Sequence, residues 1–109
     1  MVDLRSCRIK TGRHATMVLN QELRGLGTIA AGATVVIGSI PAGWGSVGTT
    51  SYVYFQANVL TTVPQNTRSL ELLIHNNGTV AIRNYTATAV SAGTGTIWIL
   101  ASVSWITNS

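Results

Sequence analysis

The alternation of apolar and polar side chains along residues 51–60 is the strongest constraint on what this chain can fold into. The odd positions form an apolar face and the even positions form an aromatic and amide face: Val53, Phe55, Ala57 and Val59 against Tyr52, Tyr54, Gln56 and Asn58. A period of two is the signature of a β-strand with one buried face, and a slip of one residue would exchange the faces. We therefore expect a strand with a firmly set register.

Most other segments also have the composition of strands. Thr, Val, Ile and aromatic residues are frequent, and these residue types suit a pleated, half-buried surface. The best helical candidate, residues 19–26, contains Gly25 and lacks a capping pattern. The sequence predicts strands over residues 5–10, 14–20, 22–29, 33–40, 51–60, 69–75, 79–85 and 95–106. Many short strands separated by Gly- and Pro-containing turns are typical of a sandwich or barrel, so the expected fold class is all-β.

Residues 70–84 carry the strongest hairpin signal, and its loop could hold two residues or three. A two-residue loop would place Leu72 opposite Arg83. A three-residue loop over residues 76–78, with its glycine left-handed, would place Glu71 opposite Arg83 instead. Opposite charges directly across two strands stabilise the pair by about 0.2–1 kcal/mol, so we predict the three-residue loop.

Three features predict that part of the surface is covered by another layer or subunit. Leu73 and Ala81 fall on the polar face of this hairpin and need a cover. The last strand, residues 96–106, is apolar on both faces in its first half, as in a strand between two layers. Only 9% of the residues are charged and 46% are hydrophobic, so a chain of 11.5 kDa is expected to pack against copies of itself.

The charged and metal-binding residue types are too sparse for several function classes. Seven basic residues against three acidic ones give a charge of +4, but no dense basic run is present, so no nucleic-acid partner is expected. The basic residues near the start alternate with apolar ones, as on the solvent side of an edge strand. Cys7 is the only cysteine and the two histidines lack metal-ligand spacing, so neither metal nor cofactor is expected. The longest apolar stretch, residues 97–106, is half of the roughly 20 residues that cross a membrane, so no membrane insertion is expected.

The sequence also offers little for catalysis. Its carboxylates are Asp3, Glu22 and Glu71, and Glu71 already has Arg83 as its expected partner. Hydrolysis by paired carboxylates needs two such groups about 5–10 Å apart. No G-x-S-x-G motif is present for a nucleophilic serine. We therefore expect a protein that is not an enzyme and has no catalytic residue.

Residues suited to binding a saccharide are better represented. Aromatic rings stack on the C–H faces of sugars, while amide, carboxylate and guanidinium groups bond their hydroxyls. Trp44 lies in a Gly-rich loop where a large aromatic has no evident core role. The candidate binding residues are Trp44, Tyr54, Gln56, Glu71, His75, Arg83 and Tyr85. The alternative for each is a solvated or subunit-facing strand surface.

Three segments together resemble a known family. They are Ile-Pro-Ala-Gly-Trp at 40–44, Leu-Leu-Ile-His-Asn-Asn-Gly-Thr-Val-Ala-Ile at 72–82, and Ile-Trp-Ile-Leu-Ala-Ser-Val-Ser-Trp at 97–105. Their order over residues 14–109 resembles the C-terminal head domain of bacteriophage tail receptor-binding proteins, in particular those of lactococcal phage baseplates. The resemblance implies a compact Greek-key, jelly-roll-like β-barrel similar to a fibre knob, assembled as a homotrimer at the tail tip of the virion. It implies a neck ending over residues 1–12 and a head over residues 13–109.

The resemblance also implies a function. Such heads bind host cell-wall saccharides, including glycerol- or phosphate-containing polymers, without catalysis. In these relatives a Trp, a His, an Asp and an Arg line the sugar site between subunits. This chain has no Asp beyond Asp3, so the nearest matches by chemistry are Trp44, His75, Glu71 and Arg83. The alternative is a purely structural spike-tip or decoration module of the virion that binds no glycan.

Overall fold

The computed structural model describes residues 8–46, 52–62 and 65–108 and shows an all-β fold, which confirms the expected fold class. The strands are β1 (Arg8–Thr11), β2 (His14–Glu22), β3 (Thr28–Ile29), β4 (Thr34–Ser39), β5 (Tyr52–Thr62), β6 (Gln65–His75), β7 (Thr79–Arg83), β8 (Val90–Ser91) and β9 (Ile97–Ile106). A short 3₁₀ helix, η2 (Ala42–Trp44), follows β4. Within these ranges no helix is long and apolar enough to span a membrane.

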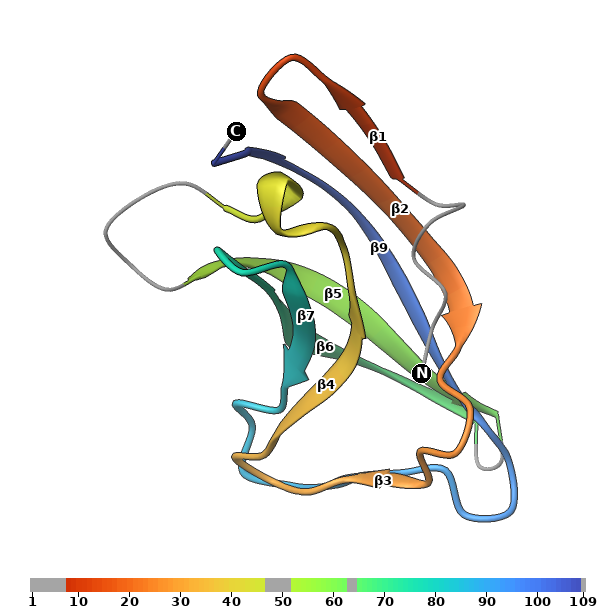
Figure 1. Cartoon of the computed structure of the whole chain (residues 1–109). Helices are drawn as coiled ribbons and strands as arrows, with labels where there is room; N and C mark the ends of the chain where they lie inside the picture. The colour runs from red at the N-terminus through yellow and green to blue at the C-terminus, as the bar shows by residue number, and fades with distance from the viewer. Residues whose placement is uncertain (1–7, 47–51, 63–64, 109) are drawn as a thin grey trace.

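Seven of the strands form one antiparallel sheet in the order β1-β2-β9-β5-β6-β7-β4, and β3 pairs with β8 in a separate two-stranded sheet. Figure 1 shows the large sheet curling from β1 and β2 at one edge round to β4 at the other. The strand twist that all sheets share accumulates over seven strands. The result is a half-barrel with an inner and an outer face.

The inner face of the curled sheet holds the hydrophobic core. Its largest fully buried side chains come from β2, β3, β5, β6, β7 and β9: Met17, Leu19, Ile29, Val59, Leu70, Leu72, Ile74, Val80, Ile82, Ile97 and Ile99. On β5 the predicted alternation is confirmed, because Ala57 and Val59 are buried while Tyr54, Gln56 and Asn58 are exposed. Trp105 is buried in the same core, as expected from its neighbours.

The hairpin of β6 and β7 has the predicted three-residue loop over residues 76–78. Glu71 lies opposite Arg83, and Leu72 lies opposite Ile82. Gly78 has a φ of 91°, in the left-handed region that glycine adopts without strain. The register deduced from the charge pair is therefore confirmed.

One strand prediction was wrong in part, and one short strand was not predicted. The predicted strand over residues 22–29 is the end of β2, a turn over 23–27 and the short β3. Gly25 has a φ of 77° in that turn, which strand backbone does not adopt, and this interrupts the strand. The sequence also missed β8 (Val90–Ser91), which is too short to carry an alternation. Part of the first predicted strand lies outside the described residues, namely residues 5–7, which include Cys7. The same is true of Asp3 and Ser51.

Leu73 and Ala81 need no cover from a second chain. They are only 2% and 1% exposed in the single chain, although they lie outside the main core cluster. In the strand register Leu73 lies beside Tyr54 and Ala81 lies beside Val36. The expectation of a covering subunit or sheet at these positions is thus wrong.

The last strand, β9, is not enclosed between two layers in the described chain. Trp98 and Leu100 are half-buried on its outer face. They lie in register with Leu60 and Asn58 of β5, so the outer surface continues across both strands.

The edge strand β1 turns its charges toward the inside of the sheet. Arg8 and Lys10 are half-buried and lie opposite the core residues Met17 and Ala15, while Ile9 between them is 71% exposed. This reverses the expectation that the basic side chains lie on the solvent side of an edge strand. Long basic side chains bury their hydrocarbon stems along apolar surface while the charge stays near water, which accounts for the arrangement.

Gly78, in the loop of the β6–β7 hairpin, is closely packed, and its substitution is expected to lower stability. A Cβ on Gly78 would lie 2.2 Å from the backbone oxygen of Ile40, while one on Gly32 would meet nothing within 4 Å. Both glycines have a positive φ, so Gly32→Ala reports the conformational cost alone, about 1–2 kcal/mol. We expect Gly78→Ala to lower the free energy of unfolding by at least about 1 kcal/mol more, measured by urea denaturation. Equal losses in the two variants would contradict the close contact.

Candidate functional site

The candidate site is a hollow of about 340 Å³ over β5 and β6. Its lining residues are Tyr54, Phe55, Gln56, Leu70, Glu71 and Tyr85. The side chains of Phe55 and Leu70 belong to the core side, whereas Tyr54, Gln56 and Glu71 occupy the outer face. The sequence named four of the lining residues as saccharide-binding candidates, and the fold brings those four together.

Strand pairing places two of these side chains side by side. Gln56 of β5 lies directly opposite Glu71 of β6, and Tyr54 lies opposite Leu73, the next outer position of β6. Side chains directly opposite one another in an antiparallel pair have Cβ atoms about 4.5–5.5 Å apart. An amide and a carboxylate therefore face the same small volume beside an aromatic ring.

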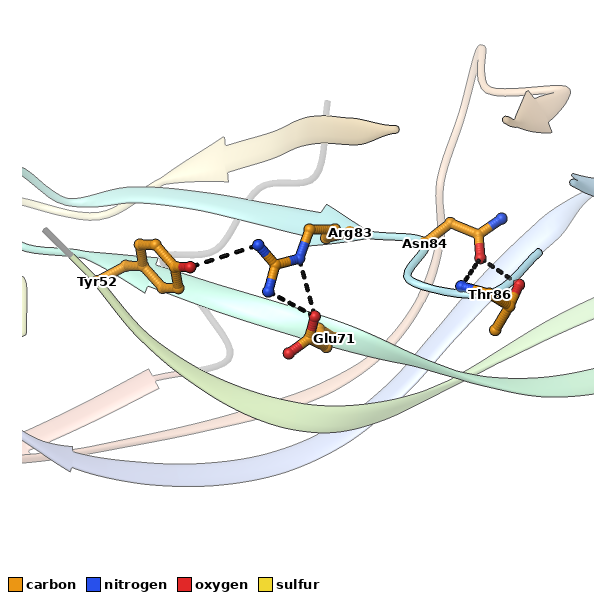
Figure 2. Close-up of polar contacts among 5 residues, drawn as sticks. All are labelled: Tyr52, Glu71, Arg83, Asn84 and Thr86. Carbon is orange, nitrogen blue, oxygen red and sulfur yellow. Dashed lines mark hydrogen bonds and ion pairs between the residues drawn. The ribbon is translucent and has the colours of Figure 1, made fainter. Parts of the chain in front are cut away.

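Tyr85 reaches the hollow from the loop after β7, which the buried Asn84 holds in place. The Asn84 amide nitrogen donates to the backbone oxygens of Ile29 at 3.1 Å and Thr88 at 2.9 Å. Its oxygen accepts the Thr86 backbone N–H at 3.1 Å and the Thr86 hydroxyl, contacts drawn in Figure 2. Tyr85 itself is 54% exposed, but the residue before it, Asn84, is buried and hydrogen-bonded through both its amide nitrogen and its oxygen.

Arg68 of β6 fixes the far side of the same loop. Its guanidinium donates to the backbone oxygens of Ala89 at 2.8 Å and Thr88 at 3.1 Å, and to the Thr86 hydroxyl. A guanidinium presents several donors in a rigid planar arrangement, which suits it to bonding several loop oxygens at once. The loop that carries Tyr85 is thus bonded at both ends.

A charged pair borders the hollow. Arg83 donates from Nε and Nη2 to the same Glu71 oxygen, Oε1, at 2.8 and 2.7 Å, and from Nη1 to the Tyr52 hydroxyl at 3.4 Å. Figure 2 shows the three side chains together. The hydrogen bond to Glu71, followed by the one to Tyr52, raises the pKa of Arg83 above its ordinary value. Arg83 therefore stays cationic throughout the biological pH range.

His75 and Arg83 adjoin the hollow without lining it. His75 packs its ring against Tyr52, with centroids 5.4 Å apart and planes tilted by 50°. Arg83 reaches the hollow only through its bonds to Glu71. These two predicted site residues are therefore neighbours of the lining and not part of it.

Trp44 lies apart from the other predicted site residues. Its side chain is half-buried and packs against the core, and its backbone oxygen accepts the Trp105 indole N–H at 2.7 Å. The Arg8 guanidinium lies 4.4 Å from the centre of the Trp44 ring, a cation–π contact across the two edges of the sheet. The expectation that Trp44 lacks a core role is wrong.

Sequence reasoning missed two residues that position the site. Tyr52 was assigned to the polar face of β5, but its bond to Arg83 was not expected. Asn84 was not among the expected site residues. An Asn two residues before a Thr, directly after a strand, is a signal for an Asx turn, in which the side chain bonds its own backbone two residues on. That signal points to Asn84 as the loop anchor.

Comparisons with protein-family models, with curated proteins and with solved structures found no match for this chain. Among the described residues no group of three His, Cys, Asp or Glu side chains could hold a metal ion.

The charged pair generates a prediction that a double-mutant cycle can check. Combining Glu71→Gln with Arg83→Gln should reveal a favourable coupling larger than that of an exposed ion pair, because two bonds converge on a Glu71 side chain that is only 16% exposed. The exposed pair Arg24–Glu22, at 3.3 Å, serves as a control with a coupling near zero. Chemical unfolding of the single and double variants measures both values. Equal coupling in the two pairs would show that the Glu71–Arg83 geometry contributes nothing special.

Proposed function

We propose that this domain is a non-catalytic saccharide-binding head that attaches a bacteriophage to its host cell surface. The observation that carries the proposal is the gathering of Tyr54, Gln56, Glu71 and Tyr85 around one hollow. These residues come from β5, β6 and the loop after β7, so the fold concentrates them from separate parts of the sequence.

The chemistry of the hollow suits a sugar. Tyr54 and Tyr85 are 63% and 54% exposed, which leaves their rings accessible for stacking on C–H faces. Gln56 both donates and accepts, and Glu71 accepts, so hydroxyl groups of either orientation find a partner. A volume of about 340 Å³ lies in the range of about 300–1,000 Å³ that is usual for small-molecule sites.

Binding without turnover fits the residues that line this site. Glu71 is the carboxylate of the hollow, and no second carboxylate lines it among the residues described. Glycoside hydrolysis by the common mechanism needs two carboxyl groups flanking the bond that is cleaved. The lining supports holding a saccharide more directly than cleaving one.

We further propose that the domain works as a homotrimer at the tail tip of the virion, with residues 13–109 as the head and residues 1–12 as the end of a neck whose last part, β1, pairs with the sheet of the head. As part of this proposal, the complete fold is a Greek-key, jelly-roll-like barrel similar to a fibre knob. The curled half-barrel supports it. The resemblance in sequence supplies the rest of this setting.

Exposed apolar side chains near one edge of the sheet support self-association. Ile9, Val18 and Ile106 are all more than half exposed and lie on the outer face of β1, β2 and β9. The outer positions between them hold hydroxyl side chains, such as Thr16 and Ser104, which bond each other at 3.1 Å. Copies of a chain with a charge of +4 repel one another less where surfaces that carry few charges meet.

The saccharide proposal predicts that the two tyrosines carry binding. Tyr54→Ala and Tyr85→Ala should each weaken binding by about 2- to 10-fold, the range expected for loss of one aromatic contact. Val36→Ala, which removes an exposed residue of β4 on the same face but outside the hollow, should leave binding unchanged. Adsorption of the fluorescently labelled domain to intact Gram-positive cells measures the effect. A wild-type domain that adsorbs to no cell would favour the structural virion module instead.

The assembly proposal predicts the mass of the particle. In sedimentation velocity at micromolar concentration we expect three times the chain mass of 11.5 kDa. Val18→Asp should shift the particle to the mass of a single chain, because a charge buried in an apolar interface is costly. Val36→Asp serves as the matched control and should remain a trimer. A single-chain mass for the wild type would refute the assembly.

A further inference from the structure

The hollow carries a local charge opposite to that of the whole chain. Among the residues described, Glu71 is the only charged residue in its lining, whereas the complete sequence has a net charge of +4. A chain this basic suggests an anionic partner when only its total charge is considered. A ligand in the hollow, however, meets the carboxylate first.

Arg83 is the cation that is bonded to this carboxylate, and its bonds hold it against the protein. Nε and Nη2 both donate to Glu71 Oε1, and Nη1 donates to the Tyr52 hydroxyl. Each of the three nitrogen atoms of the guanidinium thus has a bond within the protein, and two of these bonds go to Glu71. The raised pKa of Arg83 has the same cause, since the carboxylate stabilises the charged form. A phosphate would have to compete with Glu71 for this cation.

Glu71 retains an acceptor for a ligand. Both bonds from Arg83 end on Oε1, and no hydrogen bond from the described residues reaches Oε2. Figure 2 shows this second oxygen turned away from Arg83. A carboxylate oxygen accepts hydrogen bonds and cannot donate one, so it selects a group with an O–H or N–H to give. Sugar hydroxyls donate, and an ionised phosphodiester does not.

Gln56 completes the pattern because it lies directly opposite Glu71 in the strand register. Its amide offers a donor and an acceptor beside the pure acceptor of the carboxylate. Two hydroxyls on neighbouring ring carbons can then bond Glu71 and Gln56 while the ring contacts Tyr54 or Tyr85.

We infer that the hollow selects uncharged saccharides with free adjacent hydroxyl groups and rejects saccharides that carry phosphate at those positions. The inference rests on the proposed saccharide-binding function and narrows its ligand class. It departs from the glycerol- and phosphate-containing polymers that the family resemblance implies.

The test compares matched probes on the wild-type protein. The probes are neutral oligosaccharides of glucose, galactose and N-acetylglucosamine, each with a counterpart carrying one phosphate, together with an oligomer of glycerol phosphate. Isothermal titration calorimetry at low and high NaCl measures the affinities. We expect at least one neutral probe to bind, its phosphorylated counterpart to bind about 10- to 100-fold more weakly, and the neutral affinity to change little with salt.

Two variants separate the carboxylate from the charged pair. Glu71→Gln should weaken binding of the neutral probe by about 10-fold and reduce the discrimination against phosphate, because it replaces the anionic acceptor with a neutral amide and releases Arg83. Arg83→Gln also breaks the pair but keeps the carboxylate, so it should weaken binding of the neutral probe less than Glu71→Gln does. Circular dichroism confirms that each variant is folded.

The outcomes distinguish this inference from the function on which it rests. Tighter or equal binding of a phosphate-bearing probe, weakened by Tyr54→Ala, would overturn the neutral-ligand inference and leave saccharide binding in place. Unchanged neutral binding in Glu71→Gln would also overturn it. Failure of every probe to bind would overturn the proposed function and this inference with it.

Discussion

One sheet has to bury a continuous apolar face, although no second sheet of similar size packs against it in the described chain. The seven strands solve this by curling, so that Met17 of β2, Leu72 of β6 and Ile99 of β9 meet inside the half-barrel. Side chains alternate along each strand, so burying one set forces the other set outward. The aromatic, amide and charged side chains of β5, β6 and β7 therefore gather on the outer face. The position of the hollow is thus a consequence of how the core is closed.

The site is built from pairing and from anchored loops, which gives it a defined shape before any ligand arrives. Gln56, Glu71 and Arg83 form one row across three neighbouring strands, so their spacing is fixed by the backbone ladders. Asn84 and Arg68 hold the loop that supplies the remaining tyrosine. Side chains that are already ordered lose less conformational entropy on binding, which favours affinity. In the same row Glu71 lines the hollow and Arg83 does not, so a ligand in the hollow meets the negative charge of Glu71 first.

Local patterns predicted the parts of the fold that depend on neighbouring residues. The alternation of apolar and polar residues predicted which face of β5 is buried. The expected attraction between Glu71 and Arg83 predicted the register of the hairpin. The turn over residues 23–27 was missed because Gly25 was considered one glycine inside a strand, and its positive φ depends on tertiary context. Trp44 was misjudged because its partners, Arg8 and Trp105, are far from it in sequence. The pairing of distant strands decides such contacts, and a single sequence contains little information about it.

Backbone amide shifts measured by NMR during a titration with a neutral oligosaccharide test most directly whether the outer hollow is the binding site. The experiment needs no variant and reports on all strands at once. If the account is correct, the largest shifts occur at Tyr54, Gln56, Glu71 and Tyr85, while the amides of β1 and β2 stay in place. Shifts centred on β1, β2 and β9, or a spectrum that does not change at saturating sugar, would contradict the account.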